Sequence, residues 1–167
     1  MIAQNNIILD NTQVEQKIKR IAYQVYETNS TENQIVIAGI SKNGYILAEK
    51  LAKVITDISP IQTILCEVFI DKKNPINSVS TSIEKDEYKN KALVLVDDVL
   101  NSGTTLIYAV KHFLDVPLKK FKTAVLVDRN HKKYPVKADF KGISLSTSIK
   151  EHVSVEFDNE KTIAYLI

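Results

Sequence analysis

The sequence has little cysteine, arginine, glycine or proline, and it has no tryptophan. Cys66 is the single cysteine, which excludes an intrachain disulfide and any metal site that needs several thiolates. Arg20 and Arg129 are the only arginines among 22 basic residues, and the net charge is only +2. Because arginine is the preferred side chain for bidentate contacts with phosphates and base edges, this composition argues against strong nucleic-acid binding.

Long apolar runs are also missing. The longest fall far short of the roughly 18 to 20 residues that a membrane span needs, and the N-terminal segment lacks the charged and apolar regions of a signal peptide. We therefore expect a cytoplasmic protein with no membrane partner. A length of 167 residues fits a single domain, 1–167, with one sheet and a helical layer.

Apolar spacing along the chain predicts alternating helices and strands. Helical spacing is found at residues 12–28, 47–59 and 106–114, and patterns typical of buried strands at 34–40, 62–70, 92–96 and 123–127. This order predicts an α/β fold with a mainly parallel central sheet flanked by helices. Two short alternating segments, near 153–157 and 162–166, predict a small irregular C-terminal hood over the strand ends, where ligands of open α/β sheets bind.

The most informative segment is the predicted strand at 92–96 with the residues that follow it. The strand is expected to end at Asp97 and Asp98, and a short polar turn at 101–105 then opens a helix. Unpaired amides at a helix N-terminus favour a phosphate, and Gly103 permits close approach to the backbone. Carboxylates accept hydrogen bonds from a sugar diol and attract divalent cations, so the combination suits a ribose that carries a 5′-phosphate.

This segment resembles the phosphoribosyl-pyrophosphate (PRPP) motif of type I phosphoribosyltransferases. The resemblance implies that Asp97 and Asp98 are the catalytic pair that meets the ribose hydroxyls. It also implies Mg²⁺ as a cofactor bound mainly through PRPP, with no metal site made by the protein alone. The alternative is a buried strand that merely ends in two solvated acids. The residues implied to bind the 5′-phosphate are Asn101, Ser102, Gly103, Thr104 and Thr105.

A second turn, between the strand at 34–40 and the next helix, matches the pyrophosphate loop of that family. The residues concerned are Ser41, Lys42, Asn43 and Gly44. The family has Lys-Thr-Arg-Gly at these positions, so Asn43 replaces an arginine, and Lys42 is the only cation there. Loss of one charge-assisted contact costs roughly 1.5 to 3 kcal/mol, which places pyrophosphate affinity in question. An ordinary strand-to-helix turn is the alternative.

Residues 71–91 form a long polar stretch without periodicity. Structureless connections of this length are uncommon in compact domains and are often lids. The resemblance implies a mobile lid that closes over PRPP, with Lys72 and Lys73 bringing positive charge to the leaving group. A solvated charged loop is the alternative.

Residues in the C-terminal third resemble one subgroup of this family, the pyrimidine-operon attenuator proteins. Those proteins bind messenger RNA in response to pyrimidine nucleotides and are also uracil phosphoribosyltransferases. The matching residues lie at 124–135, 138–142 and 146–148. The resemblance implies base contacts from Val127, Asp128 and Arg129, the substrates PRPP and a nucleobase, most favourably uracil, and a homo-oligomer, dimeric or higher.

RNA binding is the point on which the residues depart from this family. Tyr23 and Ile143 replace basic or polar residues that help to hold RNA, so we expect weak, sequence-indifferent RNA binding at most. Two alternatives stay open: a purine-type base specificity on the same fold, and a weakly catalytic, nucleotide-sensing, RNA-binding regulator of pyrimidine genes.

Overall fold

A six-stranded sheet forms the centre of the computed structural model, which describes residues 6–158 and 160–167. The strand order is β4-β3-β2-β5-β6-β7, and only β4 runs antiparallel to its neighbour. This confirms the predicted α/β fold with a mainly parallel sheet. The strands are β2 (Gln34–Ile40), β3 (Gln62–Phe69), β4 (Ser80–Thr81), β5 (Ala92–Leu100), β6 (Lys120–Asp128) and β7 (Phe140–Ser144).

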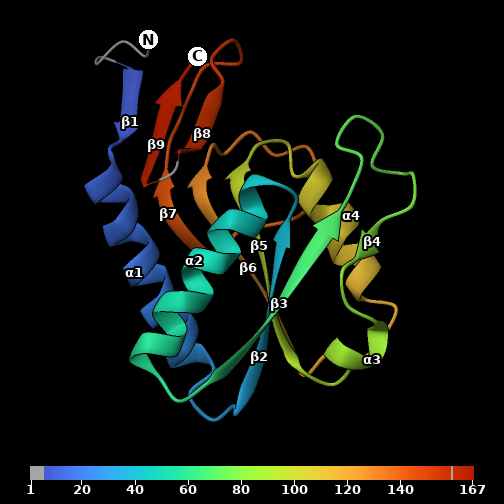
Figure 1. Cartoon of the computed structure of the whole chain (residues 1–167). Coiled ribbons are helices and arrows are strands. Elements are labelled where there is room, and N and C mark those ends of the chain that lie inside the picture. Colours follow the sequence, from blue (N-terminus) through green and yellow to red (C-terminus); the bar gives the residue numbers. More distant parts are fainter. Residues whose placement is uncertain (1–5, 159) are drawn as a thin grey trace.

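Helices cover both faces of this sheet (Figure 1). One face carries α1 (Asn11–Thr28) and α2 (Asn43–Ile58), and the other carries α3 (Lys85–Tyr88) and α4 (Thr104–Phe113). Side chains alternate across a strand, so β2 supplies Ile35 and Ile37 to one core and Val36 to the other. In the described part of the chain, no helix is long and apolar enough to cross a membrane.

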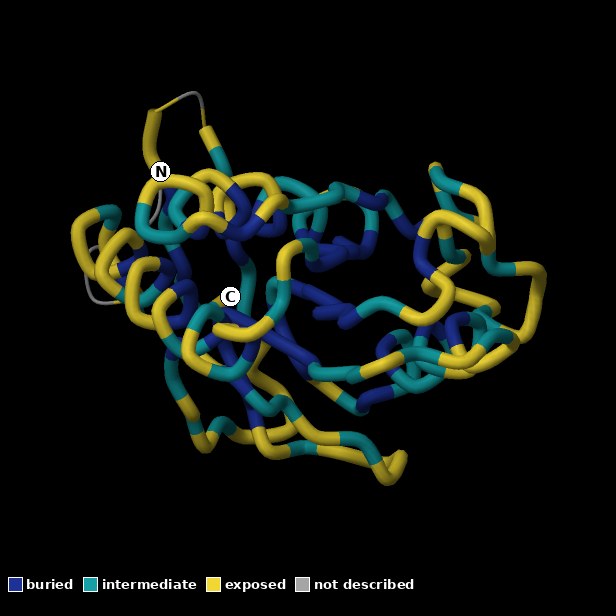
Figure 2. The backbone as a smooth tube through the Cα atoms, turned by 90° about the horizontal axis from the view of Figure 1, so that it is seen from below, coloured by how far each residue is buried: buried dark blue, intermediate teal, exposed yellow. Residues whose placement is uncertain are grey.

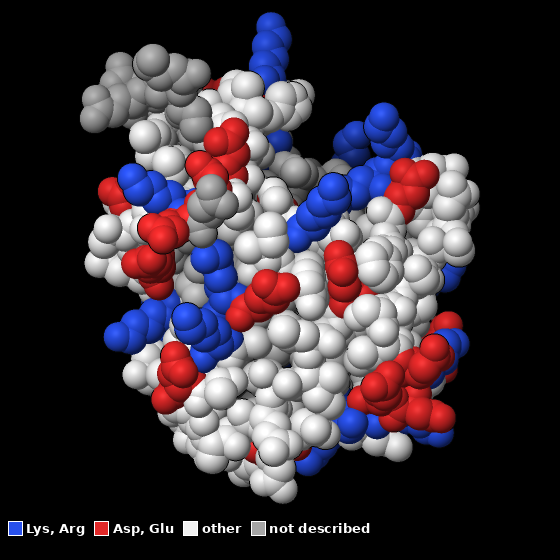
Figure 3. Space-filling view, in the orientation of Figure 1, with Lys and Arg blue, Asp and Glu red and all other residues white. Residues whose placement is uncertain are grey.

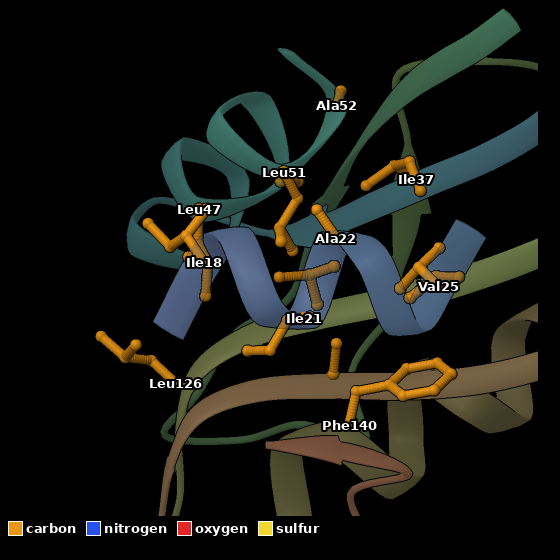
Figure 4. Close-up of a cluster of buried hydrophobic side chains, with 14 of the residues drawn as sticks. Ile18, Ile21, Ala22, Val25, Ile37, Leu47, Leu51, Ala52, Leu126 and Phe140 are labelled. Carbon is orange, nitrogen blue, oxygen red and sulfur yellow. The ribbon is translucent and has the colours of Figure 1, made fainter. Parts of the chain in front are cut away.

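The larger core lies between the sheet and the α1–α2 layer. Figure 4 shows Ile21 and Ala22 of α1 close to Leu51 of α2. Leu126 of β6 and Phe140 of β7 belong to the same buried cluster, from the sheet side. Figure 2, viewed from below, shows the resulting buried centre surrounded by exposed loops and helix faces. The position of the sheet edge is therefore fixed by packing on both faces.

The hood is a regular three-stranded antiparallel sheet of order β1-β9-β8. Its strands are β1 (Ile7–Leu9), β8 (Val153–Asp158) and β9 (Lys161–Leu166). The strands predicted near 153–157 and 162–166 are confirmed as β8 and β9. The hood differs from the prediction in being regular and in taking its third strand from the N-terminal part of the chain. The strand β7 was not predicted, because its five residues are too few to show a clear alternation.

The strand that carries the acids is longer than predicted. Residues 92–96 were expected to form a strand that ends before Asp97, whereas β5 continues to Leu100. Parallel pairing with β6 supports the extension, since Asp97 pairs with Val125 and Leu100 with Asp128. The two acids are therefore held by the sheet.

The segment 71–91 is only partly irregular, which corrects the expectation of a wholly structureless stretch. It contains β4 and α3, and Tyr88 of α3 is fully buried in the smaller core. Glu84 and Glu87 form a reciprocal capping box that stabilises this short helix. Residues 70–79 remain without helix or strand.

Candidate active site

A cavity of about 230 Å³ lies at the carboxyl edge of the sheet, beneath the hood. Its walls bring together the acid pair, Asp97 and Asp98, and the turn at 101–105, here called the phosphate turn. From farther away come Asn43, Lys72 and residues 153–155 of β8. Most of the predicted substrate-binding residues thus meet in one place.

The phosphate turn has the conformation that an anion site needs. Gly103 is the N-cap of α4 with φ 85°, in the left-handed region that favours glycine. A Cβ on Gly103 would lie 2.6 Å from Cγ1 of Val136, so the space is also closed to a larger residue. Among the described residues, the amides of Gly103 and Thr105 have no hydrogen-bond partner. These free N–H groups at a helix N-terminus are suited to a phosphate.

The acid pair differs in burial. Asp97 is only 5% exposed, and its Oδ1 accepts a hydrogen bond from the amide of Asp98 at 2.9 Å. Burial, reinforced by the neighbouring Asp98 carboxylate, raises the pKa of Asp97 well above its ordinary value, and Lys72 opposes this effect. Asp98 is half-buried, and its Oδ1 accepts a hydrogen bond from the amide of Val99 at 2.9 Å.

Ser41, Lys42, Asn43 and Gly44, here called the pyrophosphate loop, connect β2 to α2. The peptide bond between Ser41 and Lys42 is cis. Lys42 is exposed, whereas Ser41 Oγ donates to Glu67 Oε1 at 2.9 Å. Neither lines the cavity.

The other half of this loop lies against the acid pair. Asn43 Nδ2 donates to Asp98 Oδ2 at 3.0 Å and to the carbonyl oxygen of Val155 at 2.9 Å. A Cβ on Gly44 would come within 3.2 Å of Asp97 Oδ1 and 2.7 Å of the carbonyl oxygen of Val96, so glycine permits this close packing.

The three predicted base-binding residues lie at the end of β6 and do not line the cavity. Val127 and Asp128 are buried, and Asp128 lies 3.7 Å from Lys132 Nζ and 3.8 Å from Lys141 Nζ. Contact of Val127, Asp128 or Arg129 with a base stays a prediction.

Arg129 is also buried, and it fixes its neighbours. It donates to Asn101 Oδ1 at 2.8 Å, to Thr147 Oγ1 at 3.0 Å, and to the carbonyl oxygens of Ser148 and Glu151. Its guanidinium thereby connects the phosphate turn to the loop that precedes β8.

Sequence reasoning missed the contribution of the hood to the cavity. Val153, Ser154 and Val155 line it, and Val155 contributes a backbone carbonyl oxygen to the contact with Asn43. A backbone acceptor leaves no signal in side-chain identity. Of the two predicted lid lysines, Lys72 lines the cavity and Lys73 does not.

The acid pair also bears on the implied magnesium. Carboxylate oxygens are ligands that Mg²⁺ prefers. The described residues contain no group of three or more side chains suited to hold a metal. Asp97 and Asp98 therefore fit an ion that takes most of its ligands from a bound substrate.

The sequence of this chain matches a known protein family. The family described as "Phosphoribosyl transferase domain" matches residues 4–160. The chain belongs to the type I phosphoribosyltransferase family.

Sequence relatives agree with this assignment. The chain is 32% identical to "Bifunctional protein PyrR" of Fusobacterium nucleatum over 96% of this chain and 97% of that protein. It is 34% identical to the protein of the same name from Clostridium acetobutylicum, over 89% of this chain and 88% of that protein.

Solved phosphoribosyltransferase structures share the fold. The hypoxanthine phosphoribosyltransferase of Trypanosoma cruzi superposes with a TM-score of 0.76, covering 96% of this chain and 95% of that chain at 14% identity. A hypoxanthine-guanine phosphoribosyltransferase from Bacillus anthracis gives a TM-score of 0.70 at 20% identity, covering 84% of this chain and 81% of that chain. At such identities the likeness concerns the phosphoribosyltransferase fold and leaves the base unassigned.

Proposed function

We propose that this protein transfers the phosphoribosyl group of PRPP to a nucleobase, with uracil as the favoured base, and releases pyrophosphate. The main support is that the acid pair and the phosphate turn line one cavity. Free amides are suited to the 5′-phosphate, and two carboxylates next to them are suited to the ribose hydroxyls. The preference for uracil rests on the C-terminal sequence resemblance and on the similarity to proteins named PyrR.

The electrostatics of the acid pair suit this reaction. As the bond from the ribose carbon to pyrophosphate breaks and the bond to the base nitrogen forms, positive charge develops on the ribose. Asp97 is a buried carboxylate with a raised pKa, so its negative charge is poorly solvated and is stabilised by an adjacent positive charge. No side-chain nucleophile is needed, because positioning and electrostatic stabilisation lower the barrier.

The leaving group departs on the side of the pyrophosphate loop and the lid. Lys72 lines the cavity and acts on Asp97, so it brings positive charge to this region. Asp97 and Asp98 would help to hold Mg²⁺, which when bound with PRPP neutralises charge on the pyrophosphate. Closure of residues 70–79 would exclude water from the reacting atoms.

A panel of bases tests the proposal. Uracil, orotate, hypoxanthine, xanthine, guanine and adenine are each incubated with PRPP and Mg²⁺, and nucleotide and pyrophosphate are measured. We expect UMP from uracil, and little product from the other bases. Product from a purine alone would replace uracil with a purine specificity. Absence of product from every base would contradict the transferase activity.

A second candidate, a nucleotide-sensing regulator with little transfer activity, is favoured by one observation. The amide of Asn43, which stands where the family has an arginine, is bonded to Asp98 and Val155 within the protein. Such a site holds a nucleoside monophosphate better than it holds pyrophosphate. A rise in melting temperature with UMP, together with absent turnover, would support this candidate.

The RNA function of such a regulator finds little support in the two arginines or on the face of α1 and α2. Arg20 donates to the carbonyl oxygens of Lys141 at 3.0 Å and Gly142 at 2.7 Å, and Arg129 is buried. Figure 3 shows acidic and basic side chains interspersed over the face of α1 and α2. We therefore expect weak, salt-sensitive binding with no sequence preference. In a competition assay, a pyrimidine-leader hairpin and a scrambled hairpin should bind alike. A preference of about a hundredfold for the leader, strengthened by uridine nucleotides, would contradict this expectation.

A further inference from the structure

The hood is fastened to the edge of the main sheet at two places. One is Arg129, a buried side chain that bonds to the loop at 147–151 and to Asn101. The other is Asn43, a half-buried side chain with one bond to Asp98 and one to β8. The first fastening has four bonds and reaches the cavity wall through Asn101, whereas the second has two and lies in that wall itself. The Asn43 fastening joins a member of the acid pair directly to β8.

The chemistry of this contact depends on a primary amide. Asn43 Nδ2 carries two hydrogens, and its acceptors are Oδ2 of Asp98 and the carbonyl oxygen of Val155. Leucine has a similar shape but no donor, and aspartate has a similar shape but repels Asp98.

Asp98 receives a donor on each carboxylate oxygen. The amide of Val99 donates to Oδ1 at 2.9 Å, and Asn43 donates to Oδ2 at 3.0 Å. Two donors on opposite oxygens fix the rotation of the carboxylate. Asp98, held in this rotation, lines the cavity.

We propose that Asn43 is a positioning residue that orients Asp98 and holds hood strand β8 closed over the cavity. The inference deepens the proposed phosphoribosyl transfer and rests on it for its kinetic consequence. Where the family has an arginine that would bind pyrophosphate, Asn43 instead forms hydrogen bonds to Asp98 and to hood strand β8. Occupation of the ribose site and closure of the hood are thereby coupled.

Hydrogen exchange of β8 without substrates tests the link itself. Asn43→Leu removes both bonds at nearly constant volume, and we expect amide exchange in Val153–Asp158 to rise about tenfold. Asn33→Leu is the matched control, because Asn33 is exposed and precedes β2 at the opposite edge of the sheet. Equal exchange in wild type and Asn43→Leu would overturn the proposal. This measurement holds even if no base in the panel is a substrate.

Kinetics then test the orientation of Asp98. Asn43→Leu should raise KM for PRPP and lower kcat, each about tenfold, whereas partial unfolding would lower kcat alone. Asn43→Gln keeps the amide and should restore part of both values. Asn43→Asp places a second carboxylate beside Asp98 and should raise KM for PRPP at least as much as Asn43→Leu does. An unchanged KM for PRPP in all three variants would overturn the positioning role while leaving the proposed transfer intact.

Discussion

The phosphate turn and the pyrophosphate loop are built alike and are used differently. Each connects a parallel strand to a helix at the same edge of the sheet, β5 to α4 and β2 to α2, and these two strands are neighbours. The phosphate turn leaves the amides of Gly103 and Thr105 free among the described residues. All five residues of the phosphate turn line the cavity, whereas only Asn43 of the pyrophosphate loop does, and its side chain is bonded within the protein.

The difference indicates which part of a substrate the protein is best prepared to hold. A ribose 5′-phosphate finds an anion site and two carboxylates. Pyrophosphate finds Lys72 in the cavity wall and an exposed Lys42 outside it. The nucleotide end of the site is thus more completely formed than the leaving-group end.

The largest effect is expected from the acid pair, which lies between the two loops. Asp97→Asn combined with Asp98→Asn should lower phosphoribosyl transfer by orders of magnitude, because the negative charge that stabilises the reacting ribose is lost. Steady-state rates measure this loss, and circular dichroism checks that the fold is retained. Unchanged turnover would exclude the proposed catalytic role.

The phosphate turn should be sensitive to a single methyl group. Gly103→Ala places a Cβ 2.6 Å from Val136 at a residue with φ 85°, so the turn must shift and its amides lose their alignment. We expect UMP binding to weaken about ten- to a hundredfold, by calorimetry, consistent with the loss of one or two charge-assisted bonds. Uridine, which lacks the phosphate, is the control and should bind equally to both proteins. Equal weakening of both ligands would mean that the change is not specific to the phosphate.

A substitution in the pyrophosphate loop should strengthen ligand binding, in contrast to the substitution in the phosphate turn. Asn43→Arg supplies the cation that this loop lacks, and we expect pyrophosphate to bind about tenfold more tightly, measured as product inhibition. Asn33→Arg adds the same charge at the distant edge of the sheet and controls for net charge. If both variants behave alike, the effect does not come from the loop, and the comparison between the two loops fails.

The smallest effect concerns stability. The folded-state pKa of Asp97 lies above its ordinary value, so its contribution to stability is present below the unfolded-state pKa and is lost as the pH rises through the folded-state pKa. Asp97→Asn should therefore raise Tm by a few degrees at neutral pH, and the gain should shrink as the solution is acidified. Glu49→Gln, at an exposed site on α2, removes the same charge and serves as the control for net charge. A Tm difference for Asp97→Asn that is independent of pH would contradict the raised pKa.

The helices, strands and turns that were predicted from the sequence are those whose defining residues lie close together in the chain. In α2, Leu47, Leu51 and Ile55 recur at helical spacing and are all buried. The phosphate turn was predicted because strand, turn and helix follow one another within a few residues. The hood was predicted only in its two C-terminal strands, because β9 pairs with both β8 and the distant β1. The helix α3 has only four residues, too few for periodicity to appear.

The sequence predicted that the acid pair and the phosphate turn would lie together, but it did not predict the hydrogen bonds that connect them to the hood. Asp97, Asp98 and the phosphate turn meet as expected. The sequence does not show that Asn43 bonds to Val155, because the acceptor is a backbone atom 112 residues away. The sequence also does not show that Arg129 is bonded to the loop before β8. An arginine at a strand end has the same local sequence pattern whether it bonds to a neighbouring loop or contacts a base.

The pairing of Ile7 with Tyr165 has a consequence for biosynthesis. Strand β1 leaves the ribosome early and finds its partner only after β9 has emerged. Such a distant contact is slow to form, so the main sheet has time to fold before the hood. A nascent chain would then display its acid pair and phosphate turn in an open edge. The roof above them would be the last part of the molecule to arrive.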